Sequence, residues 1–235
     1  MELSIILPAY KEAENLKKIL PSINSVLQSQ NVKYEIIVVD TIEKMDDTFD
    51  VCKLNNVVCI FRQGGNYYGD AIRTGIHNSK GKYILIMDAD GSHEVKSIVE
   101  LYKKISDDDY DIVVGSRYCK GGKTDNNFIL KAMSWMLNVT YRVIFGLKVK
   151  DCSNSFRIYD SNKLKSIELE CINFDIVEEI LIKLQLKFPL LKMGEVPVHF
   201  KKREEGFSKR DLVKFILTYF STIKRLLYLK NNVKK

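Results

Sequence analysis

Short apolar runs and amphipathic stretches alternate through the first half of the chain. The apolar runs are rich in β-branched residues and predict buried strands at residues 3–7, 34–39, 57–61, 83–87 and 111–115. Between them, apolar residues at helical spacing predict helices at residues 12–28, 45–54, 69–79 and 95–105. Such alternation is typical of βαβ units, so we expect an α/β fold with a mainly parallel sheet and helices on both faces.

The regular alternation ends after residue 117. A largely apolar helix is predicted at residues 128–145, another helix at 174–186 and a strand around 193–200. A polar loop at 201–210 precedes a basic amphipathic helix from residue 211 to about 230. Because no linker or repeat interrupts the chain, we expect one domain over residues 1–210 and a helical appendage, rather than a second domain, over 211–235.

Positive charge is concentrated at one end of the chain. The net charge is +7, yet residues 201–235 hold eleven Lys or Arg against three acids, so the first two hundred residues carry about −1. A nucleic-acid-binding stripe is therefore disfavoured. The 46% apolar and 29% charged composition is typical of a soluble protein with a core. The five cysteines form no C-x-x-C pair, and neither a leader pattern nor a spanning apolar window is present, so we expect reduced thiols and a cytoplasmic protein.

Two carboxylates follow the strand predicted at 83–87. Asp88 and Asp90 would lie at the carboxyl edge of the sheet, where open α/β folds bind ligands. Oxygen ligands of this kind suit Mg²⁺ or Mn²⁺ shared with substrate phosphates, although Asp-x-Asp-Gly also occurs in solvated turns. Asp40 and the segment from Pro8 to Glu12 end two further strands, so three polar strand ends are expected to converge.

The motifs around these positions occur in the order found in one enzyme family. They are Leu7-Pro8-Ala9-Tyr10-Lys11-Glu12-Ala13-Glu14-Asn15, Ile37-Val38-Val39-Asp40, Gly69-x-Ala71-x-Arg73-x-Gly75-Ile76, Met87-Asp88-Ala89-Asp90-Gly91-Ser92-His93, Val114-Gly115-Ser116-Arg117-Tyr118 and Arg203-x-x-Gly206-x-Ser208-Lys209. The chain resembles family 2 glycosyltransferases, and more narrowly their polyprenyl-phosphate (dolichol-phosphate) mannose synthase branch. The resemblance extends from the first strand to about residue 209.

The resemblance implies a GT-A type of fold with a Rossmann-like sheet, and a nucleoside-diphosphate sugar donor. GDP-mannose is the favoured donor and a UDP-sugar the alternative. Asp88 and Asp90 would hold Mg²⁺ or Mn²⁺, and Asp90 and Arg117 would be catalytic. The residues implied in nucleotide-sugar binding are Pro8, Ala9, Tyr10, Glu12, Val39, Asp40, Arg73, Asp88, Ala89 and Asp90.

The resemblance further implies inverting transfer to a polyprenyl (dolichyl or undecaprenyl) phosphate at the cytoplasmic face of a membrane. A lipid phosphate is already an anion, so the reaction needs a cationic clamp rather than a strong base. The residues implied at the acceptor phosphate are Lys131, Ser134, Arg203, Ser208 and Lys209. For Arg157, a structural ion pair with Asp151 or Asp160 is slightly favoured.

Two other functions stay open. A hydroxyl acceptor in surface-polysaccharide assembly would need a carboxylate base, for which Asp151, Glu178 and Glu179 are candidates. For the two glutamates, early in a helix, a solvated role or one that complements the helix dipole is expected at least as much. The third hypothesis is a non-catalytic basic module that binds membrane or nucleic acid.

Two departures from the family pattern concern the donor. Asp40-Thr41-Ile42-Glu43 replaces the common Asp-Asp-Gly-Ser, which leaves the nucleotide open, and Ser155 replaces a glycine near the expected sugar pocket. The C-terminal helix is expected either to lie on a membrane surface or to pack on the domain, a second copy of the chain or a small membrane partner. Trp135 of the helix at 128–145 is either a core residue or a lipid contact.

Overall fold

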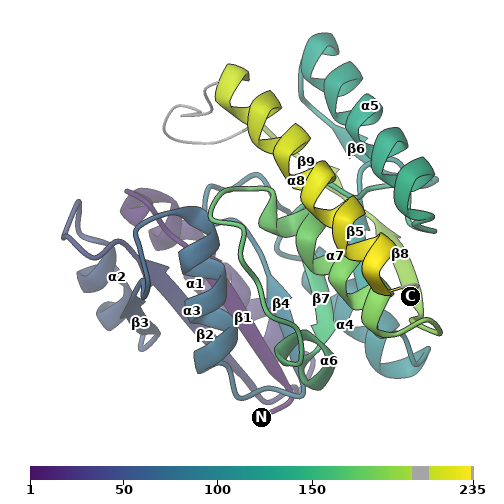
Figure 1. Cartoon of the computed structure of the whole chain (residues 1–235). Coiled ribbons are helices and arrows are strands. Elements are labelled where there is room, and N and C mark those ends of the chain that lie inside the picture. Colours follow the sequence, from purple (N-terminus) through teal and green to yellow (C-terminus); the bar gives the residue numbers. More distant parts are fainter. Residues whose placement is uncertain (203–211, 234–235) are drawn as a thin grey trace.

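The computed structural model describes residues 1–202 and 212–233, with side chains described for 1–202 and 218–232. A seven-stranded sheet in the order β3-β2-β1-β4-β7-β5-β8 forms its centre (Figure 1). The strands of this sheet are β1 (Leu3–Pro8), β2 (Tyr34–Asp40), β3 (Val58–Phe61), β4 (Tyr83–Ile86), β5 (Ile112–Ser116), β7 (Arg157–Asp160) and β8 (Met193–Pro197). The five strands predicted in the first half are all present.

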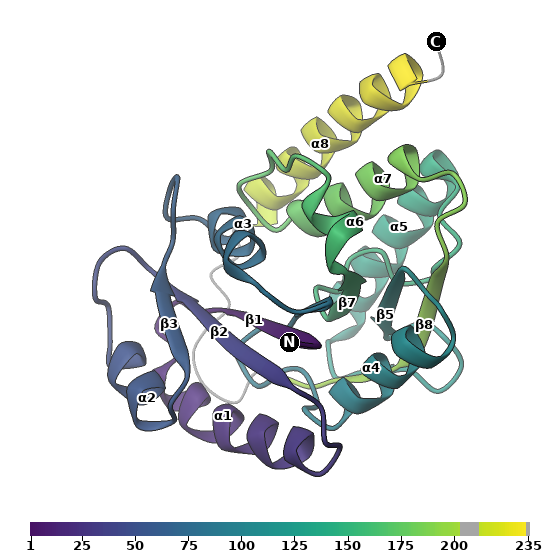
Figure 2. The same ribbon diagram turned by 90° about the horizontal axis from the view of Figure 1, so that it is seen from below.

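Helices cover both faces of the sheet, as Figure 2 shows. One face carries α1 (Ala13–Gln28), α2 (Thr48–Leu54) and α4 (Ser97–Asp107), and the other carries α3 (Tyr68–Asn78), α6 (Ser161–Lys165) and α7 (Ile176–Lys187). Each face has its own apolar core because side chains alternate along each strand. Leu3, Ile5 and Leu7 of β1 therefore face α1, whereas Ile6 faces α3.

The antiparallel strand β7 is the main feature that the sequence did not predict. It lies between β4 and β5 and is antiparallel to both, with Arg157 opposite Ile86 and Val114. Four residues, two of them charged, are too few to show strand periodicity. The single strand expected around 193–200 is also two strands, β8 and β9 (His199–Phe200), and β9 pairs with β6 (Lys123–Thr124).

Two long helices lie outside the sheet layers. They are α5 (Phe128–Phe145), which Asn127 caps through a bond from the Leu130 N–H (2.9 Å), and α8 (Leu212–Val233). From residue 218 onward α8 packs on the domain, with Leu226 buried and Tyr219 edge-on to Tyr141 of α5, their ring centroids 6.3 Å apart. No helix within the described residues is long and apolar enough to span a membrane.

The outer surface of α5 is apolar although it faces no other part of the described chain. Its exposed side chains include Trp135, which is 60% exposed and thus not a core residue. The other large apolar residues exposed on this helix are Phe128, Ile129, Leu130, Met136 and Val143. These residues together are named the α5 apolar surface below.

Candidate active site

The carboxyl ends of β1, β2, β4 and β5 meet at one edge of the sheet. Parallel pairing aligns β1 with both β2 and β4, and the N–H of Ala9 donates to the carbonyl of Val39 (2.9 Å), which joins the first two strand ends. Pro8, Asp40 and the Asp88 turn therefore converge as the sequence predicted. Ala9 and Val39 are fully buried, whereas Tyr10 is exposed at this edge.

Arg62, which the sequence analysis did not single out, joins the ends of β1 and β2. Its guanidinium donates to the carbonyl of Ala9 and to the carbonyl of Asn66 (2.7 Å), and its N–H donates to the carbonyl of Asp40 (3.0 Å). Burial raises the pKa of Asp40, while the Thr41 N–H bond (2.8 Å) and the Arg62 charge oppose that change. Arg62 directly follows β3, so the strand-end reasoning that found Asp40 would also have found it.

The turn after β4 holds the two predicted metal ligands. Asp88 accepts hydrogen bonds from the Tyr68 hydroxyl at Oδ1 and from the Ser155 hydroxyl at Oδ2, both at 2.9 Å. Asp90 is buried, and its Oδ1 accepts a bond from the N–H of Ser92 (3.0 Å). Gly91 has φ of 78°, a conformation that favours glycine, so the tight turn depends on it.

His93 stabilises this turn through contacts at both of its ring nitrogens. Its Nδ1 accepts a bond from the N–H of Asp88 (3.3 Å), so the neutral ring carries its proton on Nε2, which donates to Asn154 Oδ1 (3.1 Å). Asn154 in turn donates to the carbonyl of Gly115 (2.6 Å), and the His93 ring stacks on Phe156. His93 thereby connects the end of β4 to the end of β5, a role that the sequence motif did not reveal.

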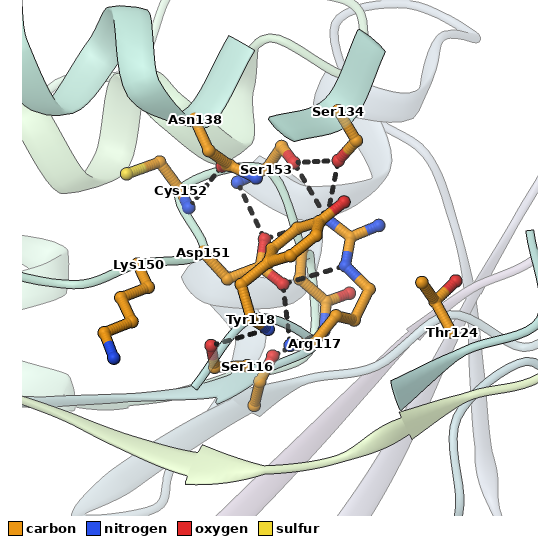
Figure 3. Close-up of polar contacts among 12 residues, drawn as sticks. Ser116, Arg117, Tyr118, Thr124, Ser134, Asn138, Lys150, Asp151, Cys152 and Ser153 are labelled. Atoms are coloured by element: carbon orange, nitrogen blue, oxygen red, sulfur yellow. Dashed lines mark hydrogen bonds and ion pairs between the residues drawn. The ribbon is translucent and has the colours of Figure 1, made fainter. Parts of the chain in front are cut away.

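A second polar cluster follows β5 and is drawn in Figure 3. Arg117 forms a buried ion pair with Asp151, with Nε to Oδ2 and Nη2 to Oδ1 both at 2.8 Å. Nη2 also contacts the hydroxyls of Ser153 (2.8 Å) and Ser134 (3.3 Å). Burial alone would raise the pKa of Asp151, but the adjacent guanidinium outweighs it and holds that pKa below its usual value. The structure thus brings together Arg117 and Ser134, two of the predicted residues.

Other predicted residues lie farther from these two clusters. Lys131 is exposed one turn before Ser134 on α5, and Glu12 accepts a bond from Asn15 (2.6 Å) at the start of α1. Arg73 donates to the carbonyl of Cys171 (2.6 Å) and to Asp70. The remaining predicted acceptor residues, Arg203, Ser208 and Lys209, lie outside the described residues.

The expected ion pair of Arg157 is not formed within the described chain. Asp151 binds Arg117 instead, and Asp160 caps α6 by accepting a bond from the N–H of Lys163 (2.9 Å). Arg157 is fully buried and donates to the carbonyls of Val177 (2.7 Å) and Cys152 (2.6 Å). Its role is structural, as expected, but its partners are backbone groups.

The expectation of solvated glutamates early in α7 is wrong, because Glu178 and Glu179 are both completely buried. Glu179 accepts bonds from the N–H of Cys171 (2.8 Å) and from Arg225 of α8 (3.1 Å) and pairs with Lys183 (3.0 Å). The helical pattern could not show this burial because α8 supplies part of the cover.

Comparison with known proteins decides the family. The sequence profile described as glycosyl transferase family 2 matches residues 4–167. The chain belongs to this family. Among similar proteins, the dolichol-phosphate mannosyltransferase of Pyrococcus furiosus is 34% identical over 234 residues, which cover 97% of this chain and 64% of that protein. The dolichol-phosphate mannosyltransferase of Saccharomyces cerevisiae is 28% identical over 241 residues, which cover 98% of this chain and 88% of that protein.

A third relative of this family 2 chain is the dodecaprenyl-phosphate galacturonate synthase of Rhizobium johnstonii. It is 25% identical over 219 residues, which cover 89% of this chain and 62% of that protein. The chain therefore spans slightly less than two thirds of the length of two of these relatives.

Solved structures confirm the GT-A type of fold. The glucosyl-3-phosphoglycerate synthase of Mycobacterium tuberculosis, solved with Mn²⁺, uridine diphosphate and glucosyl-3-phosphoglycerate, superposes with a TM-score of 0.71 at 17% identity. The match covers 97% of this chain and 79% of that one. At this identity the likeness shows the fold.

Proposed function

We propose that this family 2 chain is a metal-dependent inverting glycosyltransferase that transfers a hexose from a nucleoside-diphosphate sugar to a polyprenyl phosphate. The observation that supports it is one segment that touches both polar clusters. Ser155 contacts Asp88 on the donor side, and Ser153, two residues earlier, contacts Arg117 and Ser134 on the acceptor side. Two residues span at most about 7 Å, so the two clusters are close enough to flank one reacting bond.

On the donor side, residues at the carboxyl ends of β1 and β2 would bind the nucleotide. Pro8, Ala9, Tyr10, Glu12, Val39 and Asp40 are proposed around base and ribose, with Arg62 holding the Ala9 carbonyl in place. Asp88, Ala89 and Asp90 are proposed at the diphosphate. Arg73 remains a proposed donor residue although it faces Cys171 in this structure.

The donor set at the Asp88 turn fits a divalent cation that is shared with substrate. Within the described residues no cluster of three or more His, Cys, Asp or Glu could hold a metal by itself. Mg²⁺ is commonly bound by one or two carboxylates together with substrate phosphates and water, which is the set that Asp88 and Asp90 offer. Such an ion would neutralise the charge that the diphosphate gains as its bond to the sugar breaks. The relatives solved with Mn²⁺ or Mg²⁺ and uridine diphosphate support the same proposal.

On the acceptor side, an oxygen of the lipid phosphate would attack the anomeric carbon while the nucleoside diphosphate leaves from the opposite face. Arg117, Lys131 and Ser134 would hold that phosphate, together with Arg203, Ser208 and Lys209. Asp151 fixes the guanidinium of Arg117 through Nε and Nη2, which orients Nη1 before substrate arrives. The names of the relatives that carry dolichol-phosphate and dodecaprenyl-phosphate support this acceptor class.

The surroundings of the three candidate bases do not favour the alternative hydroxyl acceptor. Asp151, Glu178 and Glu179 are all completely buried, and Asp151 and Glu179 are already bound to basic side chains. A base must reach the proton that it removes, so the burial of these three side chains supports the lipid-phosphate acceptor over the hydroxyl acceptor.

A donor screen tests the proposed reaction. GDP-, UDP- and CDP-sugars are each incubated with polyprenyl phosphate and Mn²⁺, and the lipid product is identified by mass. We expect one hexosyl-phosphate lipid, and we expect Asp90→Ala to abolish both this product and the Mn²⁺-dependent binding of the nucleoside diphosphate. Unchanged binding and turnover in Asp90→Ala would show that the proposed metal site is wrong.

We also propose that the chain, with residues 1–210 as its catalytic domain and 211–235 as an appendage, docks peripherally on a membrane. The α5 apolar surface would contact the acyl boundary, and the basic residues beyond 200 would contact anionic headgroups. Flotation with anionic phospholipid vesicles tests this: Phe128→Ser and Trp135→Ser should reduce the bound fraction. Leu190→Ser is the matched control because Leu190 is 93% exposed at a site remote in the chain. Equal binding of all four proteins would refute the docking surface.

A further inference from the structure

Two hydroxyl groups from segments far apart in the chain hold the carboxylate of Asp88. Tyr68, the first residue of α3, donates to Oδ1, and Ser155, which lies two residues before β7, donates to Oδ2. Both bonds are 2.9 Å long. The proposed function uses Asp88 itself as a ligand and gives neither hydroxyl a role toward the cation.

Tyr68 is fixed by its surroundings. Its ring stacks on Phe174 with a centroid separation of 4.4 Å and an interplanar angle of 27°. The next residue, Gly69, donates its N–H to the carbonyl of Ile172 (2.8 Å). The hydroxyl therefore approaches Asp88 from a side chain that is packed against the segment before α7.

Ser155 is fixed on the opposite side. It is 8% exposed and lies between Asn154, whose amide is bonded to Gly115, and the fully buried Phe156. The family pattern that this chain resembles has glycine at the position of Ser155, and glycine offers no hydroxyl.

The two bonds leave the carboxylate able to bind a cation. Each carboxylate oxygen has two lone pairs, so one hydroxyl at each oxygen still leaves one lone pair per oxygen. Donors at both oxygens also fix the plane of the group, and bonds of this kind around a metal ligand orient it and strengthen metal binding. We propose that Tyr68 and Ser155 are positioning residues that orient Asp88 toward the divalent cation. This inference rests on the proposed function.

Metal binding without turnover tests the inference. Free Mn²⁺ is measured by electron paramagnetic resonance in titrations that contain GDP or UDP, with neither sugar donor nor acceptor. We expect Tyr68→Phe, Ser155→Ala and Ser155→Gly each to weaken Mn²⁺ binding about tenfold, and Tyr68→Phe combined with Ser155→Ala to weaken it further. Asp88→Asn is the reference for loss of the ligand. Tyr228→Phe, which removes an exposed hydroxyl on α8, and Ser106→Ala, which removes a half-buried one on α4, should bind as the natural chain does.

The outcomes separate the inference from the proposed function. If Asp88→Asn loses Mn²⁺ while Tyr68→Phe and Ser155→Ala bind normally, the positioning role is wrong and the metal site stands. If the natural chain shows no nucleotide-dependent Mn²⁺ binding, the proposed function fails. If the variants weaken nucleotide binding equally in EDTA, the hydroxyls contact the nucleotide and positioning is again wrong. Thermal unfolding checks each variant, and the retained hydroxyl of Ser155→Thr should restore Mn²⁺ binding relative to Ser155→Ala.

Discussion

Glu178 is a buried carboxyl group whose protonation should control stability near neutral pH. It is 0% exposed on α7, where the Tyr219 hydroxyl of α8 acts on it in the direction of the charged form. Burial raises the pKa of Glu178 to about 8, although Arg157 favours the charged form. Arg157 offsets the burial only in part, and its two terminal nitrogens are bonded to the carbonyls of Val177 and Cys152.

The sign of the pH dependence follows from this raised pKa. In the unfolded chain a glutamate has a pKa of about 4.3, so between pH 4.3 and about 8 only the folded state holds the proton. The stabilisation is fully present below pH 4.3 and is lost as pH rises toward 8, at about 1.4 kcal/mol per pH unit. Glu178→Gln has the shape of the protonated acid and cannot ionise. Its free energy of unfolding, relative to that of the natural chain, should therefore increase by about 3 kcal/mol between pH 5 and pH 7.5.

Urea unfolding followed by far-ultraviolet circular dichroism measures this difference. Both chains are unfolded at intervals from pH 5 to pH 8, and the difference between them removes the titration of all other groups. Glu100→Gln, an exposed substitution on α4, is the control and should leave the pH dependence unchanged. A difference that stays constant with pH would show that the fold does not hold the proton on Glu178, and would refute the reasoning.

Three further substitutions test other parts of the structure. Asp151→Asn should lower the free energy of unfolding, measured in urea, by about 3 kcal/mol, because it leaves Arg117 buried beside a neutral group. The control is Glu14→Gln, which removes the exposed ion pair with Lys17 and should change that free energy by less than about 0.5 kcal/mol. Gly69→Ala should lower stability by about 2 kcal/mol in thermal unfolding, because its Cβ would lie 2.2 Å from the Cys171 carbonyl oxygen, and an unchanged melting temperature would contradict that close approach. Arg225→Met should increase hydrogen exchange in α8, since it removes the 3.1 Å bond to buried Glu179; unchanged exchange would show that apolar packing alone holds the helix.

The sequence was sufficient to predict the parts of the site that follow the parallel strands. Asp40, Asp88 and Arg117 each lie at or just after the end of a predicted strand, and parallel strands bring such positions to one edge regardless of the loops between them. The same reasoning could have included Arg62, which follows β3 in the same way.

The contacts of segment 151–157 could not be predicted from the sequence, because they depend on the antiparallel strand β7. Because β7 begins with Arg157 between β4 and β5, the residues just before it lie at the carboxyl edge of these strands. Ser155 therefore contacts Asp88, and Asp151 contacts Arg117. A four-residue strand has too little periodicity to reveal that return.

The pairing of Arg117 with Asp151 also changes where positive charge is available for an acceptor phosphate. Within the described residues the buried pair is neutral overall, so Arg117 offers oriented hydrogen bonds rather than net charge. Exposed Lys131 and the basic residues beyond 200 are then the remaining source of charge in the proposed acceptor site. Exposed charges are screened by salt, whereas short oriented bonds in a buried pair are not. If the proposed function is correct, Lys131→Ala should reduce the salt dependence of KM for polyprenyl phosphate. Arg117→Lys should instead reduce kcat and leave that salt dependence unchanged.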